Sequence, residues 1–209
     1  MKTILVCNQK GGVGKSLVAD EIAFSFERSG IPVSFYDLDA QGGTLHRTRE
    51  ADGAQVAVVD TPGALQEALS EWLKEADVVV IPTRTTSRDI EPLTRMRKAV
   101  FKHSRAKIVY VMNGWNRFKA SRDFMEWFEG LAGDQTVVTL PQSEAFVQAG
   151  AAGVSVVEFD RRGKAARATC ALVDTVREAA EFPRDYRRSE PFSVWTNQGA
   201  RCIIVQMRK

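Results

Sequence analysis

The seven residues Lys10-Gly-Gly-Val-Gly-Lys-Ser16 decide the fold, because they separate a short apolar run, Thr3–Asn8, from a segment with helical spacing, Leu17–Arg28. In a glycine-rich turn between a strand and a helix, consecutive backbone N–H groups converge on phosphate oxygens, and the helix N-terminus adds a favourable dipole. We therefore expect Lys15 to contact the β- and γ-phosphates of a nucleotide and the Ser16 hydroxyl to ligate Mg²⁺. The expected backbone and side-chain contacts come from Gly11, Gly12, Val13, Gly14, Lys15, Ser16 and Leu17.

The rest of the chain alternates between short apolar runs rich in β-branched residues and segments with helical spacing. This alternation is typical of βαβ units, and it predicts an α/β fold: a mainly parallel, twisted sheet with helices on both faces. In such a sheet, ligands bind along the edge where the strands end. The predicted strands are Thr3–Asn8, Val33–Asp37, Gln55–Asp60, Asp77–Ile81, Lys107–Met112 and Thr136–Leu140, and the predicted helices include Leu17–Arg28, Ala64–Glu75, Ile90–His103 and Gly163–Glu181.

The pattern supports one domain over residues 1–182, followed by a tail at 183–209 that either adds an edge strand or stays loose. No stretch reaches the roughly 18 apolar residues that a bilayer crossing needs, and the N-terminal apolar run is too short for a signal peptide. The cysteines Cys7, Cys170 and Cys202 lie far apart, without a metal-ligand spacing. We therefore expect a cytoplasmic protein with reduced thiols.

The glycine-rich turn departs from the common pattern G-x-x-x-x-G-K-[ST] at its first position, where this chain has Gln9. Gln9-Lys10-Gly-Gly-Val-Gly-Lys-Ser16 instead resembles the deviant Walker A box of the ParA/MinD family of ATPases. The resemblance implies a deviant P-loop NTPase fold and a homodimer that encloses ATP, in which Lys10 reaches across the interface to the partner's nucleotide. A second cation offsets charge on the triphosphate and makes dimerisation depend on it.

A second segment supports the resemblance. Asp37-Leu-Asp-Ala-Gln-Gly-Gly43 follows a predicted strand and resembles the family's D-x-D-P-Q-G-N segment, with Ala40 in place of proline and Gly43 in place of asparagine. By this resemblance Asp39 orients or activates the attacking water, and Asp37 supports the Mg²⁺ region. The alternative for either aspartate is a cap of a helix or a turn.

Further matches follow the third predicted strand and later ones. Val58-Val-Asp-Thr-Pro-Gly63 resembles the Walker B segment, which implies that Asp60 holds Mg²⁺ through water and that the Gly63 N–H senses the γ-phosphate. Asn113 ends a strand where family members often place an asparagine that reads adenine, although it could equally be a turn residue. Pro141 belongs to a segment whose counterpart lies near the base.

Positive charge is segregated along the chain, although the formal net charge is only +3. Residues 84–122 hold eleven basic and two acidic residues, and residues 160–209 hold eleven basic and six acidic residues, with Arg161, Arg162, Lys164 and Arg167 close together. Such segments suit a polyanionic partner. The last 20 residues show no helix with one apolar and one basic face, so we do not expect a membrane anchor there. We favour duplex DNA, bound without sequence preference through salt-sensitive phosphate contacts.

Together these features predict a Mg²⁺-dependent ParA-type ATPase that forms an ATP-dependent sandwich dimer, binds DNA at the nucleoid and is released when a partner protein stimulates hydrolysis. Its predicted role is plasmid or chromosome partition, or the positioning of another cargo. A MinD-like or adaptor ATPase that acts on membrane or protein partners is an alternative, as is a phosphoryl-transfer enzyme or GTPase on the same scaffold. Asp60-Thr-Pro-Gly63 resembles the GTPase D-x-x-G, but Gly-Trp-Asn after Asn113 does not match the guanine-reading N-K-x-D.

Overall fold

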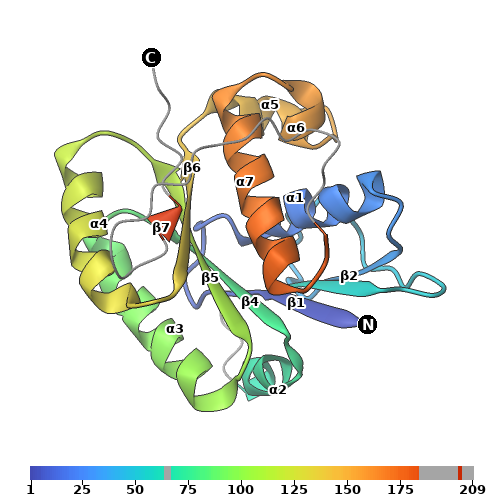
Figure 1. Ribbon diagram of the computed structural model, residues 1–209, viewed down its shortest axis with the longest axis horizontal. Coiled ribbons are helices and arrows are strands. Elements are labelled where there is room, and N and C mark those ends of the chain that lie inside the picture. Colours follow the sequence, from blue (N-terminus) through green and yellow to red (C-terminus); the bar gives the residue numbers. More distant parts are fainter. Residues whose placement is uncertain (64–66, 184–201, 204–209) are drawn as a thin grey trace.

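A computed structural model describes residues 1–63, 67–183 and 202–203. Its central feature is a seven-stranded sheet, parallel throughout, with the order β2-β3-β1-β4-β5-β6-β7 (Figure 1). The strands are β1 (Lys2–Val6), β2 (Val33–Asp37), β3 (Val56–Asp60), β4 (Val78–Arg84), β5 (Lys107–Trp115), β6 (Thr136–Pro141) and β7 (Cys202–Ile203).

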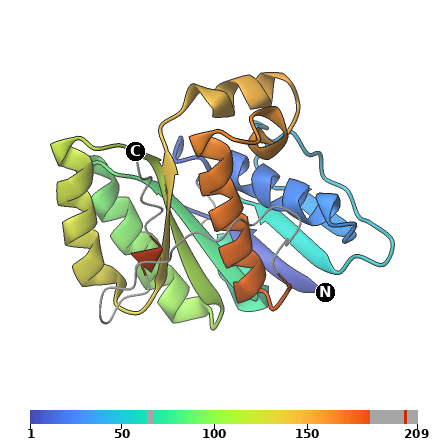
Figure 2. The ribbon, with the colours of Figure 1, turned by 45° about the horizontal axis from the view of Figure 1, so that its top comes forward.

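Helices cover both faces of the sheet, as Figures 1 and 2 show. One face packs against α1 (Lys15–Arg28) and α7 (Lys164–Ala179), and the short helices α5 (Glu144–Ala151) and α6 (Val156–Phe159) lie against the start of α7. The other face packs against α2 (Glu67–Glu75), α3 (Ile90–His103) and α4 (Lys119–Ala132), and a 3₁₀ turn, η1 (Ser87–Asp89), precedes α3. The predicted α/β architecture is therefore confirmed.

The central strands read as continuous apolar runs because both of their faces are buried. In β1, Ile4 and Val6 point into the core beneath α1 and α7, whereas Leu5 points into the core beneath α2, α3 and α4. Side chains of a strand alternate between the two faces, so each core takes every second residue. Each fully buried side chain of this kind stabilises the fold by roughly 1.5–3 kcal/mol.

All six predicted strands form, and three of them continue beyond their predicted ends, β6 by the single residue Pro141. β4 continues to Arg84 and β5 to Trp115. The start of the second predicted helix and most of the predicted tail fall on residues 64–66, 184–201 and 204–209, outside the described part of the chain. The described piece of that tail, β7, pairs with β6 in parallel and so supplies the edge strand that the sequence left open.

The path of the chain places the ligand site at the end of β1. After β1 the chain builds β2 and β3 on one side, and it then crosses β1 to build β4, β5 and β6 on the other. Open α/β sheets bind ligands where this reversal opens a crevice at the carboxyl ends of the strands. The residues that follow β1 are those of the glycine-rich turn, 9–16.

Candidate nucleotide-binding site

The glycine-rich turn needs glycine at two of its positions. Gly12 has φ 71° and Gly14, the N-cap of α1, has φ 95°, so both lie in the left-handed region that favours glycine. A Cβ on Gly14 would also lie 2.1 Å from the side-chain nitrogen of Asn113. Among the described residues, no side chain caps α1 and no acidic residue stands in its first turn. The free N–H groups at this helix end are therefore available to an anion.

A pocket of about 670 Å³ opens beside the turn. It is formed by three segments: the turn itself, the segment after β2 and the segment after β3. The lining residues are Gln9, Gly11, Gly12, Gly14, Lys15, Ser16, Leu17, Asp39, Gln41, Gly42, Pro62 and Gly63. Eight of these were predicted from the sequence, whereas Gln9, Gln41, Gly42 and Pro62 are additions that are recognisable only as neighbours of motif residues.

The two lysines of the turn differ in their surroundings. Lys15 is buried, and its Nζ donates to the carbonyl of Lys10 at 3.3 Å, so its ammonium lies under the backbone of the turn. Lys10 does not line the pocket, because its Nζ lies 2.7 Å from the carboxylate of Asp89 in η1. The position of Lys15 fits its predicted contact with phosphates, while the reach of Lys10 into a partner stays a prediction.

Asp60, at the end of β3, is a carboxylate with unused oxygens. It is 1% exposed, and neither side-chain oxygen has a hydrogen-bond partner of standard geometry among the described residues. Burial raises the pKa of Asp60 to about 7; the hydroxyl of Ser16 and the ammonium of Lys15 oppose the rise, while the charge of Asp37 adds to it. A carboxylate of this kind beside a hydroxyl fits Mg²⁺, which prefers oxygen ligands.

In the described ranges, no three His, Cys, Asp or Glu side chains converge as a metal site. A Mg²⁺ ion held by Ser16 and Asp60 would therefore take its other ligands from phosphates and water, as this ion commonly does. Asp37 faces Asp60 in the register between β2 and β3, but its oxygens accept the N–H of Asp39 at 3.0 Å and the hydroxyl of Thr44 at 2.6 Å. Its predicted support of the metal stays a prediction.

The segment after β2 brings Asp39 to the pocket. Asp39 Oδ1 accepts the N–H of Gln41 at 3.0 Å, which closes a tight turn and keeps the carboxylate at the pocket wall. Gly63, at the end of the segment after β3, lies so close to the turn that a Cβ there would be 3.4 Å from the backbone nitrogen of Gly11. Both residues therefore lie at the pocket beside the glycine-rich turn, while their predicted roles stay predictions.

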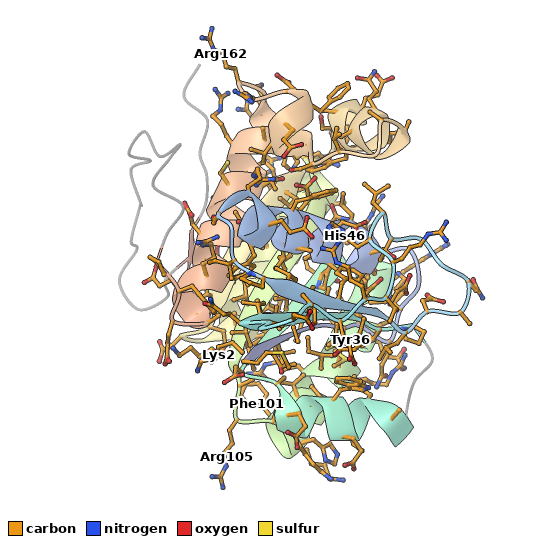
Figure 3. The ribbon with its side chains drawn as sticks, turned by 90° about the vertical axis from the view of Figure 1, so that its right-hand side faces the viewer. Lys2, Tyr36, His46, Phe101, Arg105 and Arg162 are labelled. Carbon is orange, nitrogen blue, oxygen red and sulfur yellow. The ribbon has the colours of Figure 1, made fainter. Side chains whose placement is uncertain are left out.

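A buried histidine that sequence reasoning missed fastens the segment after β2 to α1. His46 is 7% exposed, and its Nδ1 lies 2.7 Å from Asp20 Oδ1. Asp20 also accepts the N–H of His46 at 3.0 Å and that of Leu45 at 2.8 Å. The imidazole packs between the rings of Phe24 and Phe35, and Figure 3 shows it beside α1. The chain that carries Asp39 is thus tied to the helix that carries Lys15 and Ser16.

Asn113 lies behind the turn, at the end of β5. Its Nδ2 donates to the carbonyl of Val13 at 2.8 Å, and the residue is 7% exposed. This hydrogen bond fixes the backbone of the glycine-rich turn, so Asn113 has a structural role whether or not it also contacts the base of a nucleotide. Pro141 ends β6 and pairs with Trp115 across a register shift. The predicted contacts of Asn113 and Pro141 with adenine stay predictions.

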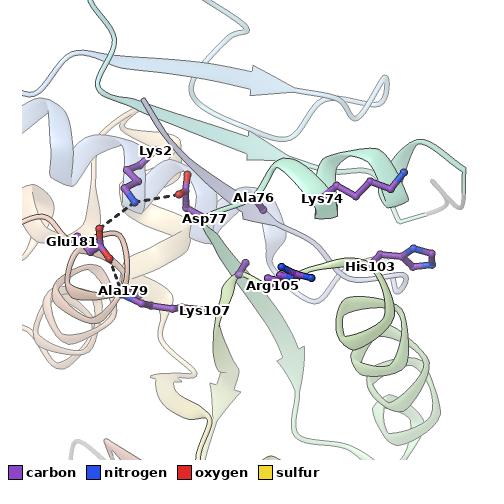
Figure 4. Close-up of a pocket in the computed structure, with 10 residues that line it drawn as sticks. Lys2, Lys74, Ala76, Asp77, His103, Arg105, Lys107, Ala179 and Glu181 are labelled. Carbon is purple, nitrogen blue, oxygen red and sulfur yellow. Dashed lines mark hydrogen bonds and ion pairs between the residues drawn. The ribbon is translucent and has the colours of Figure 1, made fainter.

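A second pocket, of about 420 Å³, lies at the opposite edge of the sheet (Figure 4). Carboxylates pair with part of its positive charge: Lys2 lies 3.2 Å from both Asp77 and Glu181, and Lys107 lies 3.4 Å from Glu181. The helices α2, α3 and α7 end here, and helix C-termini favour cations. The basic lining residues are Lys2, Lys74, His103, Arg105 and Lys107. Helix ends therefore account for this charge, and we assign the pocket no ligand.

The model of the CobQ/CobB/MinD/ParA nucleotide binding domain family matches residues 4–156. The chain belongs to this family. The resemblance of the glycine-rich turn to the ParA/MinD box is thereby confirmed, and the protein is a nucleotide-binding ATPase of the ParA/MinD type. The match begins in β1 and ends at the start of α6, so it includes the turn, Asp39, Asp60, Gly63, Asn113 and Pro141.

Relatives differ in how much of this ParA/MinD-type chain they share. Maintenance of carboxysome distribution protein A of Gloeobacter kilaueensis is 30% identical over 224 residues, which cover 90% of this chain and 96% of that protein. Protein ParA of Rhizobium radiobacter is 27% identical over 43% of this chain and 51% of its own length. Protein IncC of Escherichia coli is 42% identical over 50 residues, 24% of this chain and 14% of IncC.

Solved structures of the family share the fold at low sequence identity. The ATP complex of a variant of Cyanothece McdA has a TM-score of 0.72 at 15% identity, with 87% of this chain and 97% of that chain covered. The cell division ATPase MinD of Pyrococcus furiosus has a TM-score of 0.64 at 17% identity, with 85% and 98% covered. These values confirm the predicted deviant P-loop architecture.

No helix in the described ranges is both long and apolar enough to pass through a bilayer.

Proposed function

We propose that this ATPase is a ParA-type switch in which two copies enclose Mg-ATP, bind duplex DNA without sequence preference and separate after hydrolysis. The observation that carries the proposal is the position of the exposed basic residues. Eight exposed basic residues lie at the carboxyl ends of the strands, the same edge that holds the nucleotide pocket. A DNA-binding surface at this edge would be completed only when ATP brings two such edges together.

The strands and helices that carry these basic residues determine the edge of the sheet at which each residue lies. Arg84 is the last residue of β4, and Arg117 lies between the end of β5 and the start of α4. The end of α7 lies at the opposite edge, where Glu181 pairs with Lys2, so the start of α7 lies at the pocket edge. Figure 3 shows Arg162, just before α7, and Arg105 at opposite ends of the molecule. The exposed basic residues at the pocket edge are Arg84, Arg88, Arg117, Lys119, Arg122, Arg161, Arg162 and Lys164.

The structure divides the basic segment 84–122 into two surfaces. Arg95, Lys98 and Lys102 are exposed along α3, which runs away from the pocket edge and ends beside the second pocket. Arg105 and Lys107 lie at that far edge. Only the residues at the ends of this segment are therefore placed for binding that depends on ATP.

Dimerisation would strengthen DNA binding without a new kind of contact, because each protomer would use the same surface. Each phosphate neutralised adds roughly one counterion-release step to the affinity, so a single surface of a few cations binds weakly at cellular salt. Two surfaces joined in one dimer bind the same duplex with a high effective concentration for the second contact. Release then follows when the dimer separates.

Within the nucleotide site, each proposed role follows from position. Lys15 lies under the turn and would meet the β- and γ-phosphates, and Asp39 at the pocket wall would orient the attacking water. Ser16 and Asp60 would hold Mg²⁺, which when bound neutralises charge on the phosphates. Lys10 would contact the nucleotide of the partner protomer, which makes the γ-phosphate a condition for a stable dimer.

The proposed cellular role is the positioning of a cargo by an ATP-driven cycle of DNA binding and release. The relative that covers nearly all of the chain is named for maintaining carboxysome distribution, whereas the ParA and IncC matches are partial. A separate protein that marks the cargo and stimulates hydrolysis would complete the cycle. We therefore favour cargo positioning through a partner protein, with plasmid or chromosome partition as the related case.

The test is binding to arbitrary duplex DNA with Mg-ATP, with Mg-ADP and without nucleotide, across a salt series. We expect binding only with Mg-ATP, with a log–log salt slope of several units because several phosphates are contacted. Lys15→Ala should abolish binding in every condition. Absence of DNA binding at low salt with Mg-ATP would overturn the DNA-based mechanism and leave the ATPase without this partner.

The role of Asp39 is tested separately. Asp39→Ala should keep ATP binding and dimerisation but reduce hydrolysis by at least about a hundredfold, because a water-positioning carboxylate contributes on the order of 10²–10⁴. Hydrolysis by this variant at the wild-type rate would show that another group positions the water. Gln41→Ala, at the same pocket wall, is the matched control for disturbance of the segment.

A further inference from the structure

Lys10, which the proposed function assigns to the dimer interface, is held inside its own protomer. Its Nζ lies 2.7 Å from Asp89 Oδ1 and 3.3 Å from the carbonyl oxygen of Arg88. The side chain of Lys10 is 31% exposed, while that of Asp89 is 1% exposed. The ammonium is thus directed at η1, where Asp89 lies 79 positions later in the chain, and Lys10 does not line the nucleotide pocket.

Asp89 is arranged to receive this cation. It is the N-cap of α3, a position where aspartate usually accepts an N–H of the helix, yet its side chain forms no such bond within the described part of the chain. One carboxylate oxygen faces Lys10 and the other accepts the hydroxyl of Thr86. The N-terminus of α3 further stabilises the negative charge. The geometry favours an ion pair over a helix cap.

We propose that Asp89 is a positioning residue that holds Lys10 in the single protomer and opposes dimerisation until ATP competes for the lysine. The proposal rests on the proposed function, in which Lys10 crosses to the partner's nucleotide. When Lys10 leaves, the buried carboxylate of Asp89 keeps the Thr86 hydroxyl and the helix dipole but loses its ion pair, which is unfavourable for a buried charge. The pair therefore stabilises the monomer and not the dimer.

An interaction present in only one of two states shifts the equilibrium between them. Here the Lys10–Asp89 pair sets the ATP and protein concentrations at which dimers form, because only protomers with a released Lys10 are competent. The pair can still be broken, since water reaches Lys10 and Asp89 has other stabilising neighbours. Charge-assisted bonds from Lys10 to phosphate oxygens would replace it.

The first experiment measures dimer dissociation constants by analytical ultracentrifugation with Mg²⁺ and a non-hydrolysable ATP analogue. Asp89→Asn keeps the shape and the Thr86 contact but removes the charge, so its dimer should be tighter than wild type by on the order of tenfold, less than a fully buried pair would give. Glu91→Gln removes a charge two residues away, where Glu91 pairs with Arg95 on the exposed face of α3. This control should leave the constant within about twofold.

The second experiment tests the pair without nucleotide. An amine-acylating reagent, with labelling of Lys10 followed by mass spectrometry, should modify Lys10 several times faster in Asp89→Asn than in wild type or Glu91→Gln. Equal labelling, or an equal or weaker dimer for Asp89→Asn, overturns the proposal while leaving an ATP-dependent wild-type dimer intact. A wild-type protein that stays monomeric with the analogue overturns both the proposed function and the switching role of Asp89. Melting temperatures of the three proteins establish that all are folded.

Discussion

At the scale of one residue, the carboxylate of Asp60 shows how a side chain suited to ligand binding can destabilise the folded protein when no ligand is bound. Burial without a hydrogen-bond partner disfavours an ionised group, and the fold keeps Asp60 in that condition between β1 and β2. The same unused oxygens suit Mg²⁺. Under the proposed role of Asp60 in holding Mg²⁺, stability without ligand and affinity for Mg-ATP oppose each other at this position.

Asp60→Asn should separate these two effects. Without Mg²⁺, the variant should be more stable than wild type by about 1 kcal/mol, because a buried amide is less unfavourable than a buried charge. The stabilisation that Mg-ATP gives should largely disappear, which thermal unfolding with and without Mg-ATP would measure. Asp134→Asn, at an exposed turn, should change neither quantity. Full Mg-ATP stabilisation in Asp60→Asn would contradict the metal role of Asp60.

At the scale of elements, Glu21 of α1 holds the turn between α5 and α6. Its carboxylate accepts the hydroxyl of Ser155 at 2.5 Å and the N–H of Val156 at 2.7 Å. Burial raises the pKa of Glu21 above its usual 4.5, although the hydrogen bonds from Ser155 and Val156 oppose the rise. The link joins residues 134 positions apart, so it fixes the region before α7 from a distant part of the chain.

This raised pKa has a consequence for stability. Between 4.5 and the higher pKa of the folded state, the folded protein holds a proton that the unfolded chain releases, so the free energy of unfolding falls as pH rises through that window. Glu21→Gln cannot titrate, and the stability of wild type relative to this variant should therefore decline above pH 4.5. Urea titrations at several pH values measure the difference. Parallel curves would contradict the prediction, and Glu129→Gln, on the exposed face of α4, is the control.

A second link between elements is the anchoring of the segment after β2 by His46. His46→Ala should destabilise the protein by about 2–3 kcal/mol, because it opens a cavity and leaves Asp20 with fewer partners. The kcat of ATP hydrolysis should fall several-fold more than ATP affinity, because Asp39 on that segment loses its fixed position. His103→Ala changes the only other histidine of the chain, at the far edge of the sheet, and should leave kcat unaltered. Equal kcat values in the two variants would exclude the positioning role.

What could be predicted from the sequence is local in the chain. The turn 9–16 and the segments after β2 and β3 are contiguous motifs, and each contributes residues to the pocket, although Lys10 does not line it. The contacts that orient them are not contiguous: His46 and Asp20 are 26 positions apart, Lys10 and Asp89 are 79, and Asn113 and Val13 are 100. Only the packing of the sheet brings these pairs together.

Two groups of helices were not named individually in the sequence-based prediction, for different reasons. For α4 a signal was present, since Phe124, Phe128 and Ala132 have helical spacing and are buried in the core. For α5 and α6 there was little signal, because both are short and depend on the distant carboxylate of Glu21 and on packing against α7. That α4, α5 and α6 were not named did not affect the prediction of the site, because the residues that line the pocket lie on other elements.

At the scale of the whole molecule, the two edges of the sheet carry positive charge for different reasons. At the far edge, cations lie beside the C-termini of α2, α3 and α7 and partly pair with Asp77 and Glu181. At the pocket edge, the basic residues stand beside helix N-termini, where the dipole disfavours cations. The helix dipoles do not explain the basic residues at the pocket edge. These residues are therefore the ones that suggest a polyanionic partner.

A comparison of two triple variants tests this distinction. The first is Arg161→Ala with Arg162→Ala and Lys164→Ala at the pocket edge, and the second is Lys98→Ala with Lys102→Ala and Arg105→Ala along α3 and at the far edge. Each removes three exposed charges, so any effect of net charge alone is the same in both.

DNA affinity with Mg-ATP, measured at equal dimer content, should fall at least about tenfold for the first triple variant. Its salt slope should be smaller by about 1 for each phosphate that the variant no longer neutralises. The second triple should retain the wild-type slope, because its surface points away from the paired edges. If the second triple instead reduced affinity and slope more than the first, the DNA surface would be the outer face of α3, and binding would no longer require that ATP bring two edges together.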